Sequence, residues 1–194
     1  MNHLAHLFLA GDTAESLIGN LAGDFVKGAL RDRFPPGIER GIRQHRAIDA
    51  FTDSHPAAAA FRRVLIPGHG HYARVIADLF FDHFLALRFE EYGHEPLESF
   101  LARTYATIDP HAPLLPGRLR LVYPHMRDEG WLTSYRSIAS IHRALTHMSG
   151  RFSRNPELAS STRHLTDSRG ELEGYFEQLF PDVMAFSEQW GATP

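Results

Sequence analysis

Apolar residues along this chain recur at the spacing of helices, while the strict alternation typical of strands is weak. In the clearest case, Ile76, Phe80, His83 and Leu87 follow the i, i+4, i+7, i+11 positions of one helical face. That pattern predicts one long helix over 71–88. Similar periodicity predicts helices over 14–30, 38–51, 96–108, 131–148 and 169–180.

Prolines mark where the helical pattern should end. Pro181 is expected to stop or kink the last helix, because proline lacks the backbone N–H that an interior position needs. The stretch 110–124 carries four prolines and is predicted to be an irregular connection with at most a short helix. No linker composition interrupts the pattern, so we expect residues 1–194 to form one all-α, single-domain helical bundle.

Several apolar rows change to acids and imidazoles partway along. One row in the helix over 38–51 and just beyond it consists of Ile38, Ile42, His45, Asp49 and Thr52. Asp82 and His83 interrupt the two apolar rows of the helix over 71–88 in the same way. Because a buried carboxylate without a partner is very costly, each must meet a cation, a donor network or a metal.

The N-terminal region adds candidates to this set. His6 precedes the helix predicted over 14–30, and Asp24 within it lies three residues after Leu21, at the spacing of a buried position. Mixed imidazole and carboxylate ligands suit Mn, Fe, Mg or Zn. The predicted metal ligands are His6, Asp24, His45, Asp82 and His83. Asp49, Asp53 and Asp78 are candidates to orient those ligands or to bridge ions, and a polar network that only fixes packing is the alternative.

Composition narrows the chemistry. The chain has 13 histidines and no cysteine, so any metal must be held by His, Asp or Glu. A net charge of -3 argues against nucleic-acid binding through bulk electrostatics. The N-terminus is a poor signal peptide and no apolar window approaches the roughly 20 residues that span a bilayer, so a cytoplasmic protein is expected.

Arginine close to the candidate ligands points to a reaction class. Arg46 directly follows His45, and guanidinium groups beside a metal are the usual arrangement for gripping a phosphate. Phosphate-ester hydrolysis is therefore the predicted chemistry. The run that begins at His45 also contains Asp49, Asp53 and His55.

At these residues the chain resembles the acyl carrier protein phosphodiesterase family, a divergent relative of the HD-type phosphohydrolases. The matching segments are Asn2-His3-Leu4-Ala5-His6-Leu7, Gly19-Asn20-Leu21-Ala22-Gly23-Asp24-Phe25, His45-Arg46-Ala47-Ile48-Asp49 with Thr52-Asp53, and Asp82-His83-Phe84-Leu85. Two positions depart from the family pattern, which usually has Phe where His3 stands and Ala where Gly23 stands. The adjacent His-Asp pair for which HD enzymes are named is reversed here, as Asp82-His83.

The resemblance implies an HD-like helical fold, a divalent metal with Mn²⁺ preferred and Mg²⁺ possible, and a specific reaction. The imidazole and carboxylate ligands would also suit Fe²⁺. The implied reaction removes 4'-phosphopantetheine from the serine of holo acyl carrier protein and yields the apo form. In it Asp24 would share the metal and the attacking water, Arg46 would stabilise the phosphoryl oxygens, and His55 would protonate the departing serine. Asp49 or Asp53 would orient His45 or the water.

An acidic protein substrate further implies an arginine-lined rim, with Arg40, Arg43, Arg62, Arg63, Arg118 and Arg120 as candidates. Two alternatives remain open at the level of sequence: an HD-type phosphohydrolase acting on a nucleotide or other small phosphoester, and a non-catalytic helical module that binds the carrier protein.

Overall fold

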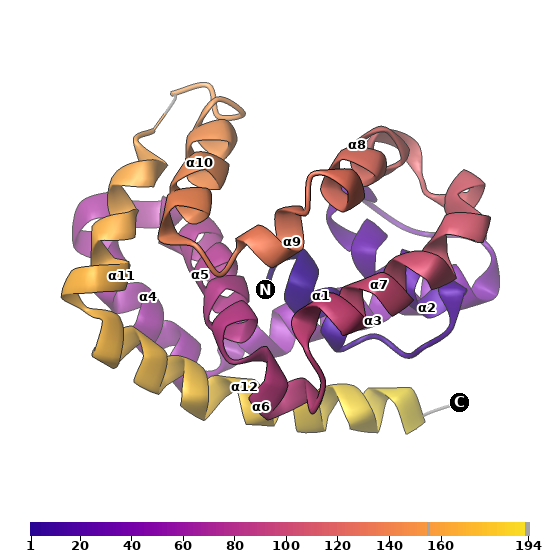
Figure 1. Ribbon diagram of the computed structural model, residues 1–194, viewed down its shortest axis with the longest axis horizontal. Coiled ribbons are helices and arrows are strands. Elements are labelled where there is room, and N and C mark those ends of the chain that lie inside the picture. Colours follow the sequence, from indigo (N-terminus) through magenta and orange to yellow (C-terminus); the bar gives the residue numbers. More distant parts are fainter. Residues whose placement is uncertain (155, 193–194) are drawn as a thin grey trace.

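The structure is a computed structural model that describes residues 1–154 and 156–192, and regular structure in these ranges is helical (Figure 1). The all-α prediction is therefore confirmed. In chain order the elements are α1 (His3–Phe8), α2 (Ala14–Ala22), η1 (Gly23–Phe25), α3 (Pro36–Ser54), α4 (Pro56–His69), η2 (Gly70–Tyr72), α5 (Ala73–Leu87), α6 (Phe89–Gly93), α7 (Leu97–Ile108), η3 (Asp109–Leu114), α8 (Gly117–Asp128), α9 (Trp131–Ser134), α10 (Ile138–Ser149), η4 (Leu158–Arg163), α11 (His164–Asp167) and α12 (Arg169–Ala192).

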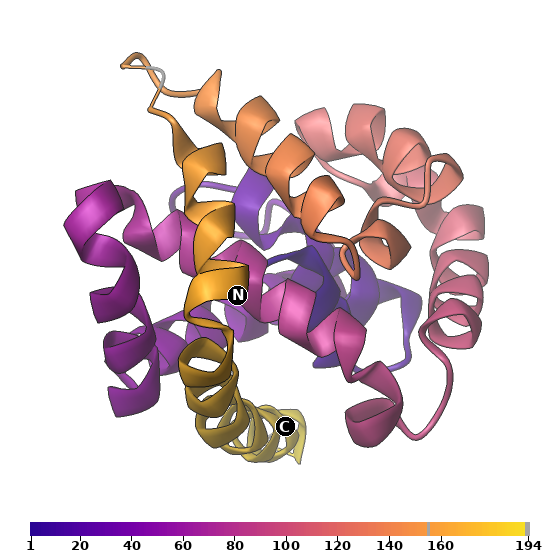
Figure 2. The ribbon, with the colours of Figure 1, turned by 60° about the vertical axis from the view of Figure 1, so that its left-hand side comes forward.

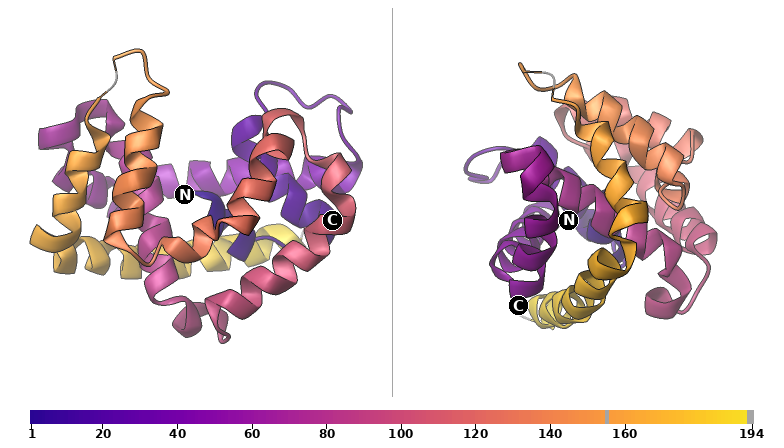
Figure 3. Two further views of the ribbon diagram at one scale, coloured as in Figure 1. Left: turned by 45° about the horizontal axis from the view of Figure 1, so that its top comes forward. Right: turned by 90° about the vertical axis from the view of Figure 1, so that its left-hand side faces the viewer.

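The short helix α1 lies near the middle of the molecule, with α5 and α2 packed against it (Figures 1 and 3). Four of its six residues, Leu4 to Leu7, are buried. A helix this short is unstable in isolation, so tertiary contacts must hold it in place. One continuous cluster of buried apolar side chains, from Met1 to Val183, supplies those contacts.

Helices α2 and α3 approach each other through two glycines. A Cβ atom at Gly19 would lie 2.4 Å from the carbonyl oxygen of Ile38 and 2.7 Å from Cα of Gly41. Both obstacles are backbone, so a larger residue would force the helices apart. The close approach lets Asn20 Nδ2 donate a 2.9 Å hydrogen bond to Gln44 Oε1. It therefore fixes the register of α2 against α3, next to His45.

The helix predicted over 14–30 is shorter than expected. α2 ends at Ala22, Gly23–Phe25 forms one 3-10 turn, and the backbone is extended at Val26. Gly28 adopts a φ of +78°, which glycine tolerates far better than other residues. Glycine-rich composition at this end, including Gly23 and Gly28, outweighs the apolar periodicity. The predicted inward orientation of Asp24 is also wrong, because its side chain is 47% exposed.

The helix predicted over 131–148 is broken into α9 and α10 between Ser134 and Ile138. At this break the carbonyl of Tyr135 accepts a 2.6 Å hydrogen bond from Nδ1 of the buried His83. A continuous helix would have used that carbonyl for its own ladder. A contact between distant segments thus ends the helix where local periodicity would have continued it.

Two prolines interrupt the helices less than predicted. α8 runs through Pro124, inside the stretch expected to be irregular, and α12 runs through Pro181 to Ala192. Both prolines are exposed, so water can satisfy the carbonyl that each leaves without a helical donor. α12 curves along one side of the molecule, against α3, α4 and α5 (Figures 1 and 2). Among the described helices, none is both long and apolar enough to cross a bilayer.

Candidate metal centre

One side chain from α1 and two side chains from α3 come together in the interior of the fold. In the described residues, His6, His45 and Asp49 offer ligand atoms that all lie within 4.8 Å of one another. His6 Nε2 is 3.2 Å from Asp49 Oδ1, and His45 Nε2 is 3.2 Å from Asp49 Oδ2. The two imidazole rings stack with their centroids 3.6 Å apart. Separations near 3 Å are what ligands about 2.0–2.2 Å from one shared ion require.

The surroundings of His45 fit a metal ligand. Its Nδ1 lies 2.8 Å from the Asn20 carbonyl, so Nδ1 carries the proton and donates it, while Nε2 points at Asp49. A second-shell bond of this kind sets the tautomer and orientation of a ligating histidine. His6 has no such support, since its buried Nδ1 lacks a partner among the described residues. Two imidazoles and a carboxylate form a donor set that fits a divalent ion.

Charge in the cluster is unevenly distributed. Burial, reinforced by the charge of His45, lowers the pKa of His6 to about 3, so its ring is neutral. Burial also opposes a charged His45, but hydrogen bonds to Asp24 and Asp49 outweigh it and raise the pKa of His45 to about 9. Burial favours a protonated Asp49, yet its hydrogen bonds to His45 and His6 hold the pKa of Asp49 far below its usual range. The metal-free cluster therefore holds one proton that a cation would replace.

We expect the affinity for a divalent ion to rise with pH up to about 9. The ion must displace the proton of His45, whose pKa is raised to about 9, so affinity should fall about tenfold for each pH unit below that value. A raised pKa also means that His45 stabilises the metal-free fold fully below pH 6.5 and loses this contribution as pH rises through about 9. Calorimetric titration with Mn²⁺ at several pH values tests this, and an affinity independent of pH would contradict it.

The cluster opens into a cavity of about 470 Å³. Asp24 and Asp49 line it on the side of the cluster, and Asp24 Oδ1 lies 3.7 Å from His45 Nε2. Asp24 therefore lies beside the cluster of His6, His45 and Asp49. It approaches this cluster from the 3-10 turn η1 and not from an α-helix. The remaining lining residues are Met1, Asn2, His3, Phe25, Val75, Asp78, Arg118, Val122, Trp131, Met148, Arg151 and Phe152.

Two of these lining residues, Arg118 and Arg151, bring positive charge to an otherwise acidic cavity. Neither forms a hydrogen bond or ion pair within the part of the chain that the structure describes. Arg118 was among the arginines expected at a rim, whereas Arg151 was not predicted. Within the same description, the expected rim residues Arg43 and Arg62 instead pair with Glu39 and Asp53.

Asp82 and His83, two of the predicted ligands, have other partners in the structure. Asp82 is fully buried and accepts backbone hydrogen bonds from Asn2 at 3.3 Å, Leu4 at 2.8 Å and Ala5 at 3.1 Å. His83 donates to the Tyr135 carbonyl. Burial was predicted correctly for both residues. The structure does not bring them into the group formed by His6, His45 and Asp49.

Three other predicted catalytic residues lie in separate contacts. Arg46 donates a 2.9 Å hydrogen bond to the Val26 carbonyl and so holds the strand-like segment after Asp24. Asp53 pairs with Arg62 and Arg74. His55 uses both ring nitrogens: Nδ1 accepts from the Ala57 amide at the start of α4, and Nε2 lies 3.1 Å from Asp182 of α12. None of the three lines the cavity.

His3 lines the cavity, whereas His55, the predicted proton donor, does not. The His3 ring stacks on Phe25 with centroids 5.8 Å apart. Its spacing from His6, three positions along α1, was the sequence signal for it. Asp78 also lines the cavity, and its carboxylate lies 2.8 Å from the amino nitrogen of Met1. That nitrogen is 3.3 Å from Asp49 as well, so the carboxylates of the site already attract a cationic group.

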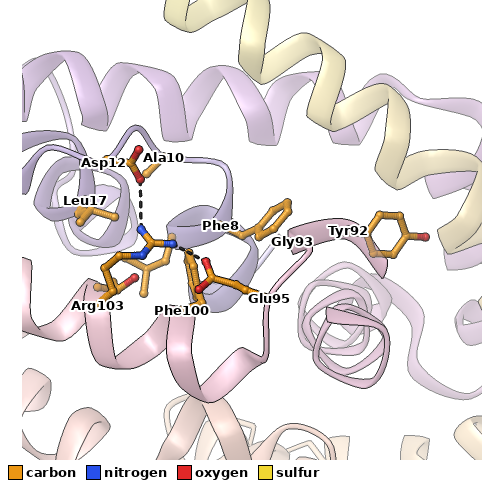
Figure 4. Close-up of a pocket in the computed structure, with 11 residues that line it drawn as sticks. Phe8, Ala10, Asp12, Leu17, Tyr92, Gly93, Glu95, Phe100 and Arg103 are labelled. Atoms are coloured by element: carbon orange, nitrogen blue, oxygen red, sulfur yellow. Dashed lines mark hydrogen bonds and ion pairs between the residues drawn. The ribbon is translucent and has the colours of Figure 1, made fainter. Parts of the chain in front are cut away.

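A second hollow, of about 200 Å³, lies at the C-terminal end of α1, next to Leu7 and Phe8 (Figure 4). Its arginine, Arg103 of α7, is held between Asp12 and Glu95, and the rings of Phe8 and Phe100 also line the hollow. Because its charges already neutralise one another, this hollow offers a weaker attraction to an anion than the cavity lined by Arg118 and Arg151. We therefore place the functional site at the larger cavity.

Fold and site together define an all-helical protein with a histidine–aspartate centre, suited to a divalent ion, at the base of a charged cavity. A sequence model described as "Acyl carrier protein phosphodiesterase" matches residues 1–183. The chain belongs to the acyl carrier protein phosphodiesterase family.

Curated relatives cover almost the whole chain. The acyl carrier protein phosphodiesterase of Serratia proteamaculans is 35% identical over 187 residues, which make up 95% of this chain and 96% of the relative. The protein of the same name from Klebsiella pneumoniae is 33% identical over 97% of this chain and 98% of its own length. That from Photorhabdus laumondii is 30% identical over 97% and 96%. No solved structure matches the chain.

Proposed function

We propose that this protein hydrolyses the phosphodiester that joins 4'-phosphopantetheine to the serine of holo acyl carrier protein. The observation that carries the proposal is the cavity, which is lined both by Asp49 of the candidate metal centre and by two arginines without partners in the described chain. Family membership supplies the substrate class. The sequence expectations of a manganese preference and a cytoplasmic location remain predictions.

A divalent ion held by His6, His45 and Asp49 would polarise a phosphoryl oxygen and lower the pKa of a bound water. Asp24 stands beside His45 as an exposed carboxylate, placed to complete the ligand set and orient the attacking water. Arg118 and Arg151 would take over the role predicted for Arg46, because they line the cavity and can grip the non-bridging oxygens.

Hydrolysis of the phosphodiester needs water as its only co-reactant. Water attacks phosphorus, the bond from phosphorus to the serine oxygen breaks, and the serine oxygen takes up a proton. His3 lines the cavity where His55 does not, but burial lowers the pKa of its ring and leaves it neutral. We therefore assign His3 to accept a proton from the attacking water, while the serine oxygen is protonated from solvent. Phe25, Trp131 and Phe152 would pack along the pantetheine arm and limit the access of water.

Incubation with holo acyl carrier protein and Mn²⁺ tests the proposal directly. Intact-mass spectrometry should show conversion of the carrier to its apo form and release of the free arm, with the chelator-treated protein as control. Hydrolysis of nucleotides without any loss of the arm would favour the small-phosphoester alternative. Carrier binding without cleavage under any divalent ion would favour the non-catalytic module.

A further inference from the structure

Helix α8 carries residues of the cavity and an exposed surface on neighbouring faces. Arg118 and Val122 line the cavity, while Leu119, Tyr123 and Met126 are buried in the core. Successive helical residues point about 100° apart, which places the Leu121 side chain about 60° from Arg118, on the side away from the core. The outer face of α8 therefore adjoins the cavity mouth.

The apolar part of this face is unusually exposed. Leu121 is 72% exposed, compared with 50% for Ile66, 41% for Leu114 and 39% for Leu87. Leu114 lies in η3, just before α8. An exposed leucine alone carries little meaning. Leu121, however, lies next to the mouth of the functional cavity, so a contact with the substrate would explain why it is exposed.

The charged part of this face is positive and lacks acidic partners. In the described chain, Arg118 has no ion pair, and Arg120 donates only to the carbonyls of Leu115 and Pro113. Arg127, at the other end of α8, is instead neutralised by Asp109 and Asp128. Positive charge is thus left over at the end of α8 that lines the cavity.

We propose that Arg118, Arg120 and Leu121, together called the α8 face, form the docking surface for the carrier protein. The inference rests on the proposed function, in which the phosphodiester is attached to a protein surface that must cover the cavity mouth. Complementarity specifies the partner surface: acidic side chains around an apolar contact, next to the modified serine. Arg118 belongs to both the cavity lining and the α8 face, so it would contact the phosphodiester as the pantetheine arm enters the cavity.

A charge at Leu121 should weaken carrier recognition without affecting the chemistry. We expect Leu121→Glu to raise KM for holo carrier protein about thirtyfold, the size of an interface hot spot, with kcat and metal content unchanged. Arg120→Glu should also raise KM and make it less dependent on salt, because an attraction that salt screens has been removed. Ile66→Glu on α4, another exposed apolar position that does not line the cavity, is the matched control and should leave KM unchanged.

Fluorescence anisotropy with labelled carrier protein separates docking from cleavage. If wild type binds the carrier and Leu121→Glu does not, the α8 face stands even when no arm is released, and only the proposed function fails. If both proteins release the arm with equal KM, the proposed function stands and the α8 face is overturned. An equal rise of KM in Ile66→Glu would also overturn it, because the effect would then be one of net charge.

Discussion

Replacing Asp49 by asparagine is expected to abolish metal binding and lower kcat/KM for holo carrier protein by about a thousandfold or more. The Asp49 carboxylate contacts both His6 and His45, at 3.2 Å each. The amide has nearly the same shape but no charge to offer a cation. Since each 1.36 kcal/mol is tenfold in rate, loss of about 4 kcal/mol of electrostatic stabilisation produces this effect.

Metal content measured by mass spectrometry and single-turnover release of the arm would test this expectation. The matched comparison is Asp53→Asn, four residues further along α3, where the carboxylate pairs with Arg62 and Arg74. That variant should keep its metal and most of its activity. Equal losses of metal and activity in both variants would show that Asp49 and Asp53 act together, as the sequence run that begins at His45 suggests. That result would contradict the assignment of Asp49 as a metal ligand in its own right.

Replacing Asp82 by alanine is expected to destabilise the metal-free fold by about 3 kcal/mol or more, because three backbone N–H groups would lose their acceptor. In a domain of this size the melting temperature should fall by roughly 6–12 °C. Since these donors lie at the start of α1, the change should also displace His6 and weaken metal binding indirectly.

Thermal unfolding in the presence of a chelator distinguishes this role from that of a ligand. If Asp82 served only as a ligand, its removal would leave the melting temperature of the metal-free protein unchanged or higher. Burial raises the pKa of Asp82 to about 7, although hydrogen bonds from Leu4 and Ala5 oppose this. A raised carboxyl pKa costs stability as pH rises from about 4 to 7, and Asp82→Ala should remove that pH dependence.

Helix content and burial could largely be predicted from local spacing. The row that contains His45 and Asp49 was predicted to share one face, and both contribute to the cluster because residues four apart on a helix lie side by side. Asp82 and His83 were likewise predicted to be buried, and each is at most 4% exposed. Spacing within a helix determines which side faces inward.

The partners of these side chains could not be predicted in the same way. His6 reaches Asp49 across 43 positions, and Asp82 meets the amides of α1 across almost twice that distance along the chain. The break at Tyr135 was decided by a tertiary contact with His83. The continuation of α8 and α12 through Pro124 and Pro181 depended instead on the exposure of these prolines to solvent, which spacing along the chain did not reveal.

The sequence by itself determined an all-helical chain with acids and imidazoles on inward faces, and its motifs pointed to the family. Only the tertiary structure decided which of those groups share a space: His6, His45 and Asp49 meet, Asp24 joins from an exposed turn, and Asp82 holds α1 in position. The physical reason is that helical periodicity is a local property, whereas a metal site requires atoms from separate helices within a few ångströms.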